Sequence, residues 1–262
     1  MIKTALLIST YNWPEALELV LKSLQNQTVK PDEVLIADDG STEKTKLTID
    51  TFISQSDLLI KHIWHNDEGF KRSEILNKAI AQTDCDYIIQ LDGDCIMHSK
   101  FIEDHITNAK QKQYLFGSRV NIQQNYLTEL FSKKNIHFGV FSSGIKKRTR
   151  NIHSSILGGF YKPTNELSEK LRGCNVSFWR ADFININGYN EDMTGWGRED
   201  SEMVVRLLNN DIVGKRLRYM AIIYHIWHNE KSRERLNIND EIQQTAIREK
   251  LLRCKNGIDK YL

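Results

Sequence analysis

The chain has 262 residues, of which 40% are hydrophobic and 27% are charged, and its formal net charge is +2. This composition is ordinary for a globular protein, and no acidic or basic tail points to a nucleic-acid partner. No run of about 18 apolar residues occurs, which excludes a transmembrane helix. The cysteines form no CxxC pair, so neither a zinc knuckle nor a disulfide framework is indicated, and a reducing cytoplasm is the simplest compartment. They are Cys85, Cys95, Cys174 and Cys254.

The first 120 residues alternate between apolar runs and helical stretches. The runs "TALLIST", "EVLIADDGS", "DLLIKHIW", "DYIIQLDGDC" and "YLFGSRV" read as strands. The stretches between them, such as "PEALELVLKSLQNQ" and "RSEILNKAIAQ", read as helices. This alternation predicts a mostly parallel sheet covered by helices on both faces, with ligands beyond the carboxyl ends of the strands.

The pattern weakens between residues 121 and 170. This part contains "FSKKNIHFGVFSSGIKKRTRN", which is basic and carries interleaved aromatic residues and glycines. It reads either as a solvated, mobile loop or as a lid that contacts an anionic acceptor or a membrane surface. Order returns from residue 171, where we expect a helix over "SEMVVRLLNN", an extended segment over "MAIIYHIWH" and a last helix over "NDEIQQTAIREKLLRCKNG".

Two carboxylates, Asp92 and Asp94, follow the strand-like run "DYIIQL". At this spacing they point to the same side of the pleat, and oxygen ligands suit a hard divalent cation. The same letters occur in phosphatases that use the first aspartate as a nucleophile, although those usually continue with threonine where this chain has Cys95.

Two histidines, His225 and His228, are three residues apart in "YHIWHNE". In a helix they would share a face, whereas in an extended segment they would point oppositely and only one could be a ligand. Either could be structural. Together with the two aspartates, one imidazole and the oxygens of a diphosphate would suit Mn²⁺.

Three further stretches offer groups that could bind a nucleotide. The segments "ISTYN" and "ADDGS" supply small polar side chains and backbone N–H groups, although the same letters also form ordinary turns. In "GFKRSEILN", Phe70 could stack on a base or pack in the core, and Arg72 could pair with phosphate or lie in water.

The motifs "STYN", "DDGS", "GFKRSEILNKAI", "LDGDC", "RGCNVSFW" and "GWGREDSE" occur in the order seen in family-2 glycosyltransferases of the GT-A fold. The last motif and the following "YHIWH" resemble the C-terminal half of β-1,4-galactosyltransferases, polypeptide GalNAc-transferases and chondroitin-synthase-type enzymes. The resemblance covers roughly residues 3 to 230. It implies an α/β fold of the GT-A type, with a Rossmann-like, mostly parallel sheet and a smaller acceptor-binding half.

The resemblance also implies roles for residues that match the family motifs. Thr10 and Tyr11 would contact the nucleotide, Asp38 and with it Asp39 the base and ribose, and Asp92 would lie near the ribose. The remaining expectations concern the diphosphate (Phe70, Arg72), the metal (Asp94 and His228, with His225 as second choice), the wall of the sugar pocket (Trp196), the sugar hydroxyls (Glu199) and the base (Asp200).

One block departs from the family. The galactosyltransferases usually have "GWGGEDDD", whereas here Arg198 replaces a glycine and Ser201 and Glu202 follow Asp200. This leaves the donor sugar open. We expect Ser201 and Glu202 merely to begin the next helix, where carboxylates suit the positive end of the dipole.

These expectations describe one GT-A domain over residues 1–262, with a nucleotide-sugar half (1–120), a flexible basic loop (121–170) and an acceptor half (171–262). The expected reaction is metal-dependent transfer, with Mn²⁺ or Mg²⁺, from a UDP-sugar to a saccharide or lipid-linked oligosaccharide, with inversion and with galactose or GalNAc favoured. The expected location is the cytoplasm, with a peripheral contact to the inner face of the membrane. The alternatives are a non-catalytic sugar-nucleotide-binding module and a metal-dependent phosphatase that uses Asp92.

Overall fold

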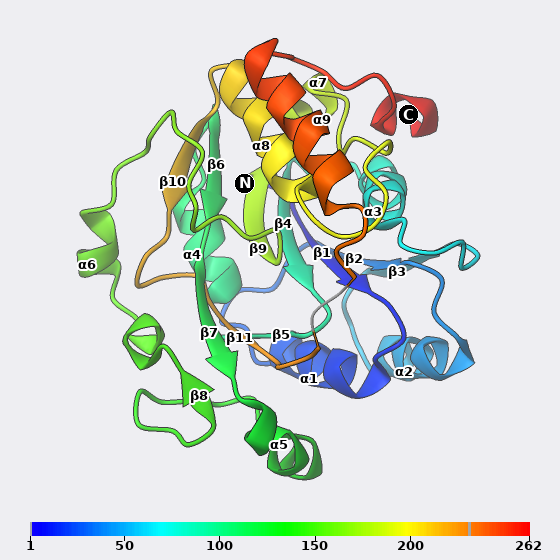
Figure 1. The fold of residues 1–262 in the computed structure, drawn as a ribbon. Coiled ribbons are helices and arrows are strands. Elements are labelled where there is room, and N and C mark those ends of the chain that lie inside the picture. The colour runs from blue at the N-terminus through cyan, green and yellow to red at the C-terminus, as the bar shows by residue number, and fades with distance from the viewer. Residues whose placement is uncertain (1, 230–231) are drawn as a thin grey trace.

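The computed structural model describes residues 2–229 and 232–262. Its main sheet has seven strands in the order β10-β6-β9-β4-β1-β2-β3 (Figure 1). All neighbouring strands in this sheet are parallel except β9, which runs antiparallel to β4 and β6. The strand bounds are β1 Thr4–Thr10, β2 Glu33–Asp38, β3 Ile60–Trp64, β4 Tyr87–Asp92, β6 Gln113–Phe116, β9 Asn175–Trp179 and β10 Val213–Arg216.

Helices cover both faces of the main sheet, because the central strands are apolar at nearly every position. Along β1, Leu6 and Ile8 pack on one face with α1, α2 and α4, and Ala5 and Leu7 pack on the other with α3, α7 and α8. This confirms the expected covered parallel sheet. The helix bounds are α1 Pro14–Gln25, α2 Glu43–Ser54, α3 Arg72–Ala81, α4 Phe101–Asn108, α7 Arg180–Asn185, α8 Glu199–Asn209 and α9 Leu236–Arg248.

A second sheet of four strands has the order β5-β11-β7-β8. The run "YLFGSRV" therefore contributes to two sheets, because the chain leaves β6 at Gly117 and enters β7. The apolar side chains of the second sheet pack against α1 and α5. The bounds are β5 Cys95–Met97, β7 Ser118–Ile122, β8 Ile145–Lys146, β11 Ile222–His225 and α5 Leu127–Lys133.

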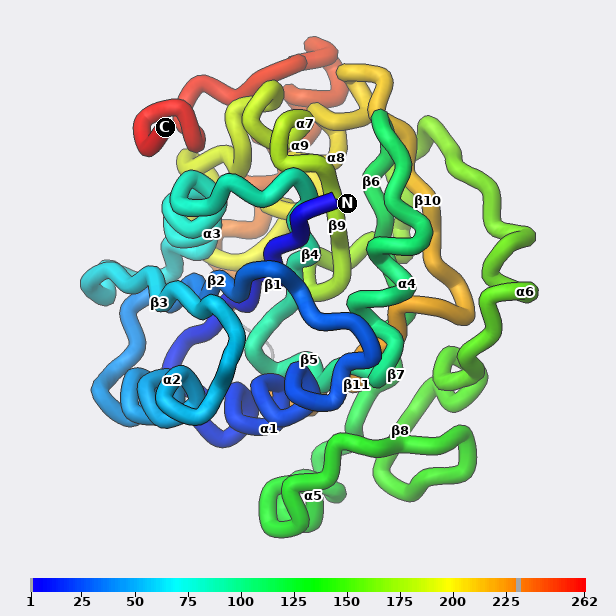
Figure 2. The backbone as a smooth tube through the Cα atoms, turned by 180° about the vertical axis from the view of Figure 1, so that it is seen from behind, coloured from blue at the N-terminus to red at the C-terminus, as the bar shows by residue number. Residues whose placement is uncertain are grey.

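Residues 121–170 form short elements rather than one long loop. After α5 and β8 come the 3₁₀ helix η2 (Arg148–Asn151) and α6 (Ser155–Gly159). Figures 1 and 2 show this segment beside β7 and β10, on the opposite side of the molecule from α2. Across the described parts of the chain, no helix is long and apolar enough to cross a membrane.

Candidate active site

The site lies beyond the carboxyl ends of β1 and β4, where α3 and α8 begin. Arg72, the first residue of α3, reaches three acidic side chains from two distant parts of the chain. Its guanidinium lies 2.8 Å from Asp92 Oδ1, 3.1 Å from Asp200 Oδ1 and 3.7 Å from Glu199 Oε1. The family resemblance predicts a contact of Arg72 with the donor diphosphate; in the structure its guanidinium contacts these three carboxylates.

The electrostatic environment differs among the three carboxyl groups. Burial alone would raise the pKa of Asp92, but the Arg72 guanidinium and the Ser9 hydroxyl, 2.8 Å away, together hold it below its usual value. Burial, and then the neighbouring Asp200 charge, raises the pKa of Glu199 to about 7. Glu199 therefore carries a proton over part of the neutral range, while Asp92 stays ionised.

Asp200 is fixed through one of its two oxygens. Arg72 and the hydroxyl of Tyr189, which is 3.2 Å away, both donate to Oδ1. Among the described residues, Oδ2 has no hydrogen-bond partner. The side chain also lies directly against Gly173, where an added methyl group would approach the carboxylate to 1.9 Å. A carboxylate held this way has a fixed orientation and one free oxygen.

Helix α8 begins at Glu199, two residues earlier than expected, so both candidate catalytic carboxylates lie in its first turn. The expectation that Glu202 merely begins the helix is wrong. Glu202 is 1% exposed and forms a two-point ion pair with Arg206, which is fully buried. Ser201 instead donates to Gln243 of α9. Glu202 and Ser201 thus anchor the helix that carries Asp200.

Asp94 and the two histidines meet in one place. His228 Nε2 lies 3.3 Å from Asp94 Oδ2, and His225 Nε2 lies 3.7 Å from the same oxygen. The expectation that only one histidine of an extended segment could face the site is wrong, because β11 ends at His225 and His228 lies beyond the strand, where side chains need not alternate. The backbone hydrogen bond from Ile226 N–H to Asp94 O holds this segment against the loop after β4.

A divalent metal ion fits this donor set. Asp94, Cys95 and His225 each offer a ligand atom, and these atoms all lie within 4.8 Å of one another. His228 lies beside this group, with its Nε2 3.3 Å from Asp94 Oδ2. Carboxylate oxygen together with imidazole nitrogen is chemistry that Mn²⁺ accepts. Cys95 Sγ is also close and lies 3.2 Å from Asp94 Oδ1. Burial raises the pKa of the Cys95 thiol well above its usual value, and in this protonated form the thiol donates to Asp94 Oδ1.

The expected nucleotide residues lie on the neighbouring strands β1 and β2. Asp38 is fully buried, and its two oxygens already accept from Ser41 N–H and face His62 at 3.0 Å. It therefore stabilises the turn after β2, which disagrees with a direct role in binding the base. Asp39 is also buried, and its Oδ1 faces His65 at 2.8 Å while its Oδ2 accepts from Lys71 N–H. Tyr11 is 42% exposed and donates to Asp67.

Trp196 and Arg198 lie on the loop before α8. Trp196 is 40% exposed, so its indole is free to form a wall, and Arg233 lies over its ring at 5.9 Å. Arg198 points to α9, where its Nε lies 2.8 Å from Asp240. Arg198 adopts a positive φ of 74°, a conformation in which glycine is ordinarily favoured. The replacement of the family glycine thus ties this loop to α9.

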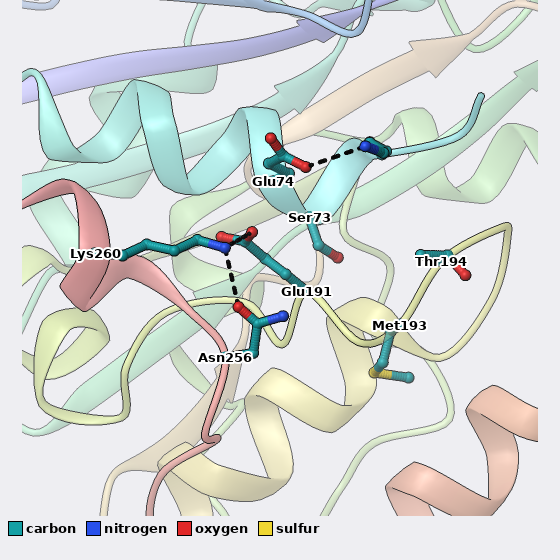
Figure 3. A pocket seen from close by; sticks show the side chains of 8 residues that line it. Ser73, Glu74, Glu191, Met193, Thr194, Asn256 and Lys260 are labelled. Atoms are coloured by element: carbon teal, nitrogen blue, oxygen red, sulfur yellow. Dashed lines mark hydrogen bonds and ion pairs between the residues drawn. The ribbon is translucent and has the colours of Figure 1, made fainter. Parts of the chain in front are cut away.

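A polar pocket of about 260 Å³ lies behind the start of α3 (Figure 3). Lys260 and Glu191 form an ion pair at 2.7 Å in this pocket. Lys260 also donates to the side-chain oxygen of Asn256. Asn77 and Tyr261 also bind Glu191. None of the described residues that line this pocket is an expected site residue, and its contacts hold the C-terminal segment against α3.

The comparisons with known proteins agree with this geometry. Residues 5–166, more than half of the chain, match the model of the family described as Glycosyl transferase family 2. The chain belongs to this family. Residues 160–229 of this family-2 glycosyltransferase also match the model described as the N-terminal domain of galactosyltransferase. Both matches confirm the resemblance inferred from the motifs.

Curated relatives of this family-2 glycosyltransferase are longer than it is. It is 24% identical over 272 residues to validoxylamine A glucosyltransferase of Streptomyces hygroscopicus subsp. limoneus, covering 98% of this chain and 56% of that protein. It is 24% identical over 221 residues to chondroitin synthase of Escherichia coli, covering 78% of this chain and 32% of that protein.

Solved structures confirm the GT-A fold. S. aureus TarS 1-349 in complex with UDP superposes with a TM-score of 0.64 at 16% identity, covering 99% of this chain and 68% of that chain. The mannosyltransferase PcManGT from Pyrobaculum calidifontis, in complex with GDP-Man and Mn²⁺, superposes with a TM-score of 0.57 at 14% identity. The match covers 85% of this chain and 56% of that chain.

Sequence reasoning missed Gly173 and Tyr189 as neighbours of Asp200. Gly173 lies in the motif "RGCNVSFW", which supports the family resemblance without assigning the glycine a role. Tyr189 lies in the loop between α7 and α8, where periodicity carries no signal. Its single hydroxyl proton is shared between Asp200 Oδ1 and Gln90 Oε1 of β4, 3.0 Å away, so Tyr189 connects the sheet to Asp200.

Proposed function

We propose that this family-2 glycosyltransferase moves a hexose or N-acetylhexosamine from a UDP-sugar to a hydroxyl group of a saccharide, with inversion at the anomeric carbon. The proposal rests on how Asp200 is held. Arg72 and Tyr189 donate to its Oδ1, while its Oδ2 accepts no hydrogen bond from the described residues and can accept a proton. Galactose and GalNAc are the preferred sugars, because residues 160–229 match a galactosyltransferase model.

The reaction is a single displacement in which Asp200 is the base. The acceptor oxygen forms a bond to the anomeric carbon while the bond from that carbon to the UDP oxygen breaks. Asp200 Oδ2 takes the proton of the acceptor hydroxyl, a contribution of about 10²–10⁴-fold in rate. Arg72 and Tyr189 keep the carboxylate from rotating, so the free oxygen stays directed at the acceptor.

The donor would bind along the carboxyl ends of β1, β2 and β4. Tyr11, Thr10 and Asp39 lie there and would contact the nucleotide, and the complex of TarS with UDP supports a UDP-sugar as the donor. Phe70 is on the loop before α3, and its carbonyl accepts from Gly195 N–H, 3.4 Å away, which joins this loop to the Trp196 segment. Trp196 offers an apolar face for the C–H side of a pyranose, and Glu199 would hydrogen-bond sugar hydroxyls.

Asp94, His225 and His228 would hold Mn²⁺ or Mg²⁺. A divalent cation offsets the charge of a diphosphate and makes it a better leaving group. The Mn²⁺ of PcManGT supports a metal requirement. Asp92, two residues before Asp94 and anchored by Ser9 and Arg72, fixes the position of the loop that carries the metal ligand.

A saccharide acceptor, free or lipid-linked, is supported by the relatives. Chondroitin synthase of Escherichia coli and hyaluronan synthase of Pasteurella multocida are among them, as is a GalNAc(5)-diNAcBac-PP-undecaprenol β-1,3-glucosyltransferase of Campylobacter jejuni. The proposal places the protein in surface polysaccharide synthesis in the cytoplasm, with peripheral contact to the membrane.

The decisive experiment measures release of UDP from a panel of UDP-sugars and then repeats it with Asp200→Asn. The variant is expected to lose at least about 100-fold in turnover, since the base is removed, while calorimetry finds its UDP affinity unchanged. Asp211→Asn, an exposed aspartate just beyond the end of α8, is the matched control. Wild-type turnover in Asp200→Asn would exclude Asp200 as the base, and a panel without any UDP release would overturn the proposed function.

A further inference from the structure

Six cationic side chains gather on the other side of the site from the nucleotide residues. They come from β7, from the ends of η2, from the segment before β9, and from the end of β10. None of them forms an ion pair with a carboxylate among the described residues. We call them the cation cluster: Arg119, Lys147, Arg150, Arg172, Arg216 and Arg218.

Backbone carbonyl groups and aromatic rings, rather than carboxylate side chains, contact three of these arginines. Arg150 Nη1 donates to Arg119 O at 3.2 Å, and Arg218 Nη2 donates to Thr149 O at 3.2 Å. The Arg218 guanidinium lies 4.4 Å from the Tyr219 ring centroid, and Arg216 lies 5.9 Å from the ring of Tyr161. These contacts fix the guanidinium planes and leave other N–H groups unused.

Two of the unused donors are buried. Within the described part of the chain, Arg216 Nε and Arg218 Nη1 have no hydrogen-bond partner, although both atoms are shielded from solvent. A buried donor without an acceptor destabilises the fold, because its bond to water is lost and not replaced. Each of these two guanidiniums therefore keeps a donor that no described group of the protein uses.

The positive charges of the cluster also repel one another. Burial first, and then the guanidiniums of Arg216 and Arg218, lower the pKa of Arg150. Burial first, and then Arg150 and Arg119, lower the pKa of Lys147. Repulsion of this kind is relieved by a bound anion, and a group with more than one negative charge matches several cations better than a single carboxylate does.

Two members of the cluster are neighbours of the site along the backbone. Arg172 directly precedes Gly173, which lies against Asp200. Arg119 pairs in register with Ile223 of β11, two residues before His225. The nucleotide residues lie instead on β1 and β2, across the main sheet. The cluster is therefore on the side of the site away from the nucleotide, where we place the acceptor.

We propose that the cation cluster binds a phosphate group of the acceptor, so that the acceptor is a saccharide that carries phosphate or diphosphate. This inference rests on the proposed transferase function. Guanidinium groups bind phosphate through paired N–H···O contacts, which suits arginine better than lysine for this task. Five of the six members of the cluster are arginines.

The test compares three probes by calorimetry, with UDP and excess Mn²⁺ present to occupy the donor site. The probes are octyl N-acetylglucosaminide, the same sugar linked to octyl through a diphosphate, and the same sugar bearing a glucuronate. The wild type is expected to bind the diphosphate probe about tenfold more tightly than the neutral one. The double variant Lys147→Gln and Arg172→Gln is expected to lose that preference while its affinity for the neutral probe persists.

The matched control is Lys133→Gln with Arg248→Gln, which removes two exposed cations outside the cluster and should keep the preference. Equal affinities of the wild type for all three probes, an undiminished preference in the Lys147 and Arg172 variant, or equally tight binding of the glucuronate probe would each overturn the inference. Failure of the proposed function would look different, since no UDP-sugar would release UDP while the preference for the diphosphate probe remained.

Discussion

At the scale of single residues, one guanidinium organises the acidic side chains of the site. Arg72 has a closest approach of 2.8 Å to Asp92, 3.1 Å to Asp200 and 3.7 Å to Glu199. One positive charge does not neutralise three carboxylates in a buried site. The least closely paired of them, Glu199, therefore has its pKa raised to about 7, by burial first and then by Asp200.

This pKa has a consequence for stability. Glu199 is protonated in both states below its ordinary pKa of 4.5, whereas between 4.5 and about 7 only the folded state keeps the proton. Its contribution to the free energy of unfolding therefore falls as the pH rises through this window. Glu199→Gln cannot ionise, so its stability relative to wild type should rise by up to about 3 kcal/mol between pH 5 and pH 8. Urea unfolding at several pH values measures this, and a difference independent of pH would contradict it.

A second prediction concerns the space beside the base. In Gly173→Ala the new methyl group would approach the Asp200 carboxylate to 1.9 Å, so the carboxylate must move away from Arg72 and Tyr189. We expect transfer to fall by at least about tenfold, because a small misplacement of a reacting group is costly. Gly159→Ala, where no atom of the described residues lies within 4 Å of the added carbon, is the control. Similar rates in both variants would show that Asp200 tolerates displacement.

At the scale of elements, helix α8 joins the base to the core. Apolar spacing predicted this helix correctly, but its first turn was missed, because Glu199 and Asp200 follow a glycine-rich loop and carry no apolar periodicity. The same limit applies to Glu202, whose i,i+4 spacing to Arg206 is visible in the sequence while its burial is not. Arg206 also donates to Ile186 O and Gly188 O. These carbonyls lie in the loop after α7, where the sequence has no periodic pattern that would predict the contact.

The buried pair sets the stability of this helix. Glu202→Ala would leave the buried charge of Arg206 without its carboxylate partner, which should lower the free energy of unfolding by about 3–5 kcal/mol. The exposed i,i+4 pair of Lys46 and Asp50 on α2 provides the control, because Asp50→Ala removes a solvated pair and should change stability little. Urea unfolding compares the two variants, and equal effects would mean that burial of the Glu202 pair contributes nothing.

At the scale of the whole molecule, segments distant in the sequence share both sheets. Strand β9 lies between β4 and β6, and β10 extends the same sheet beyond β6. The alternation of strands and helices predicted the parallel part from residues 1–120, and family motifs suggested which residues belong to the site. The pattern did not predict three features, because each depends on contacts between segments distant in the sequence. They are the antiparallel insertion of β9, the second sheet, and the approach of both histidines to Asp94.

This interleaving predicts that a ligand at the site stabilises the molecule as a unit. With Mn²⁺ present, UDP at one hundred times its Kd should add about 2.7 kcal/mol to the free energy of unfolding. Chelation of the metal should remove most of this increment and stop transfer, and added Mn²⁺ should restore both. Asp94→Ala should lose the increment even with Mn²⁺, because the oxygen on which both histidines converge is gone. Thermal unfolding followed by circular dichroism measures these shifts; an increment that persists in chelator would exclude a metal from UDP binding at this site.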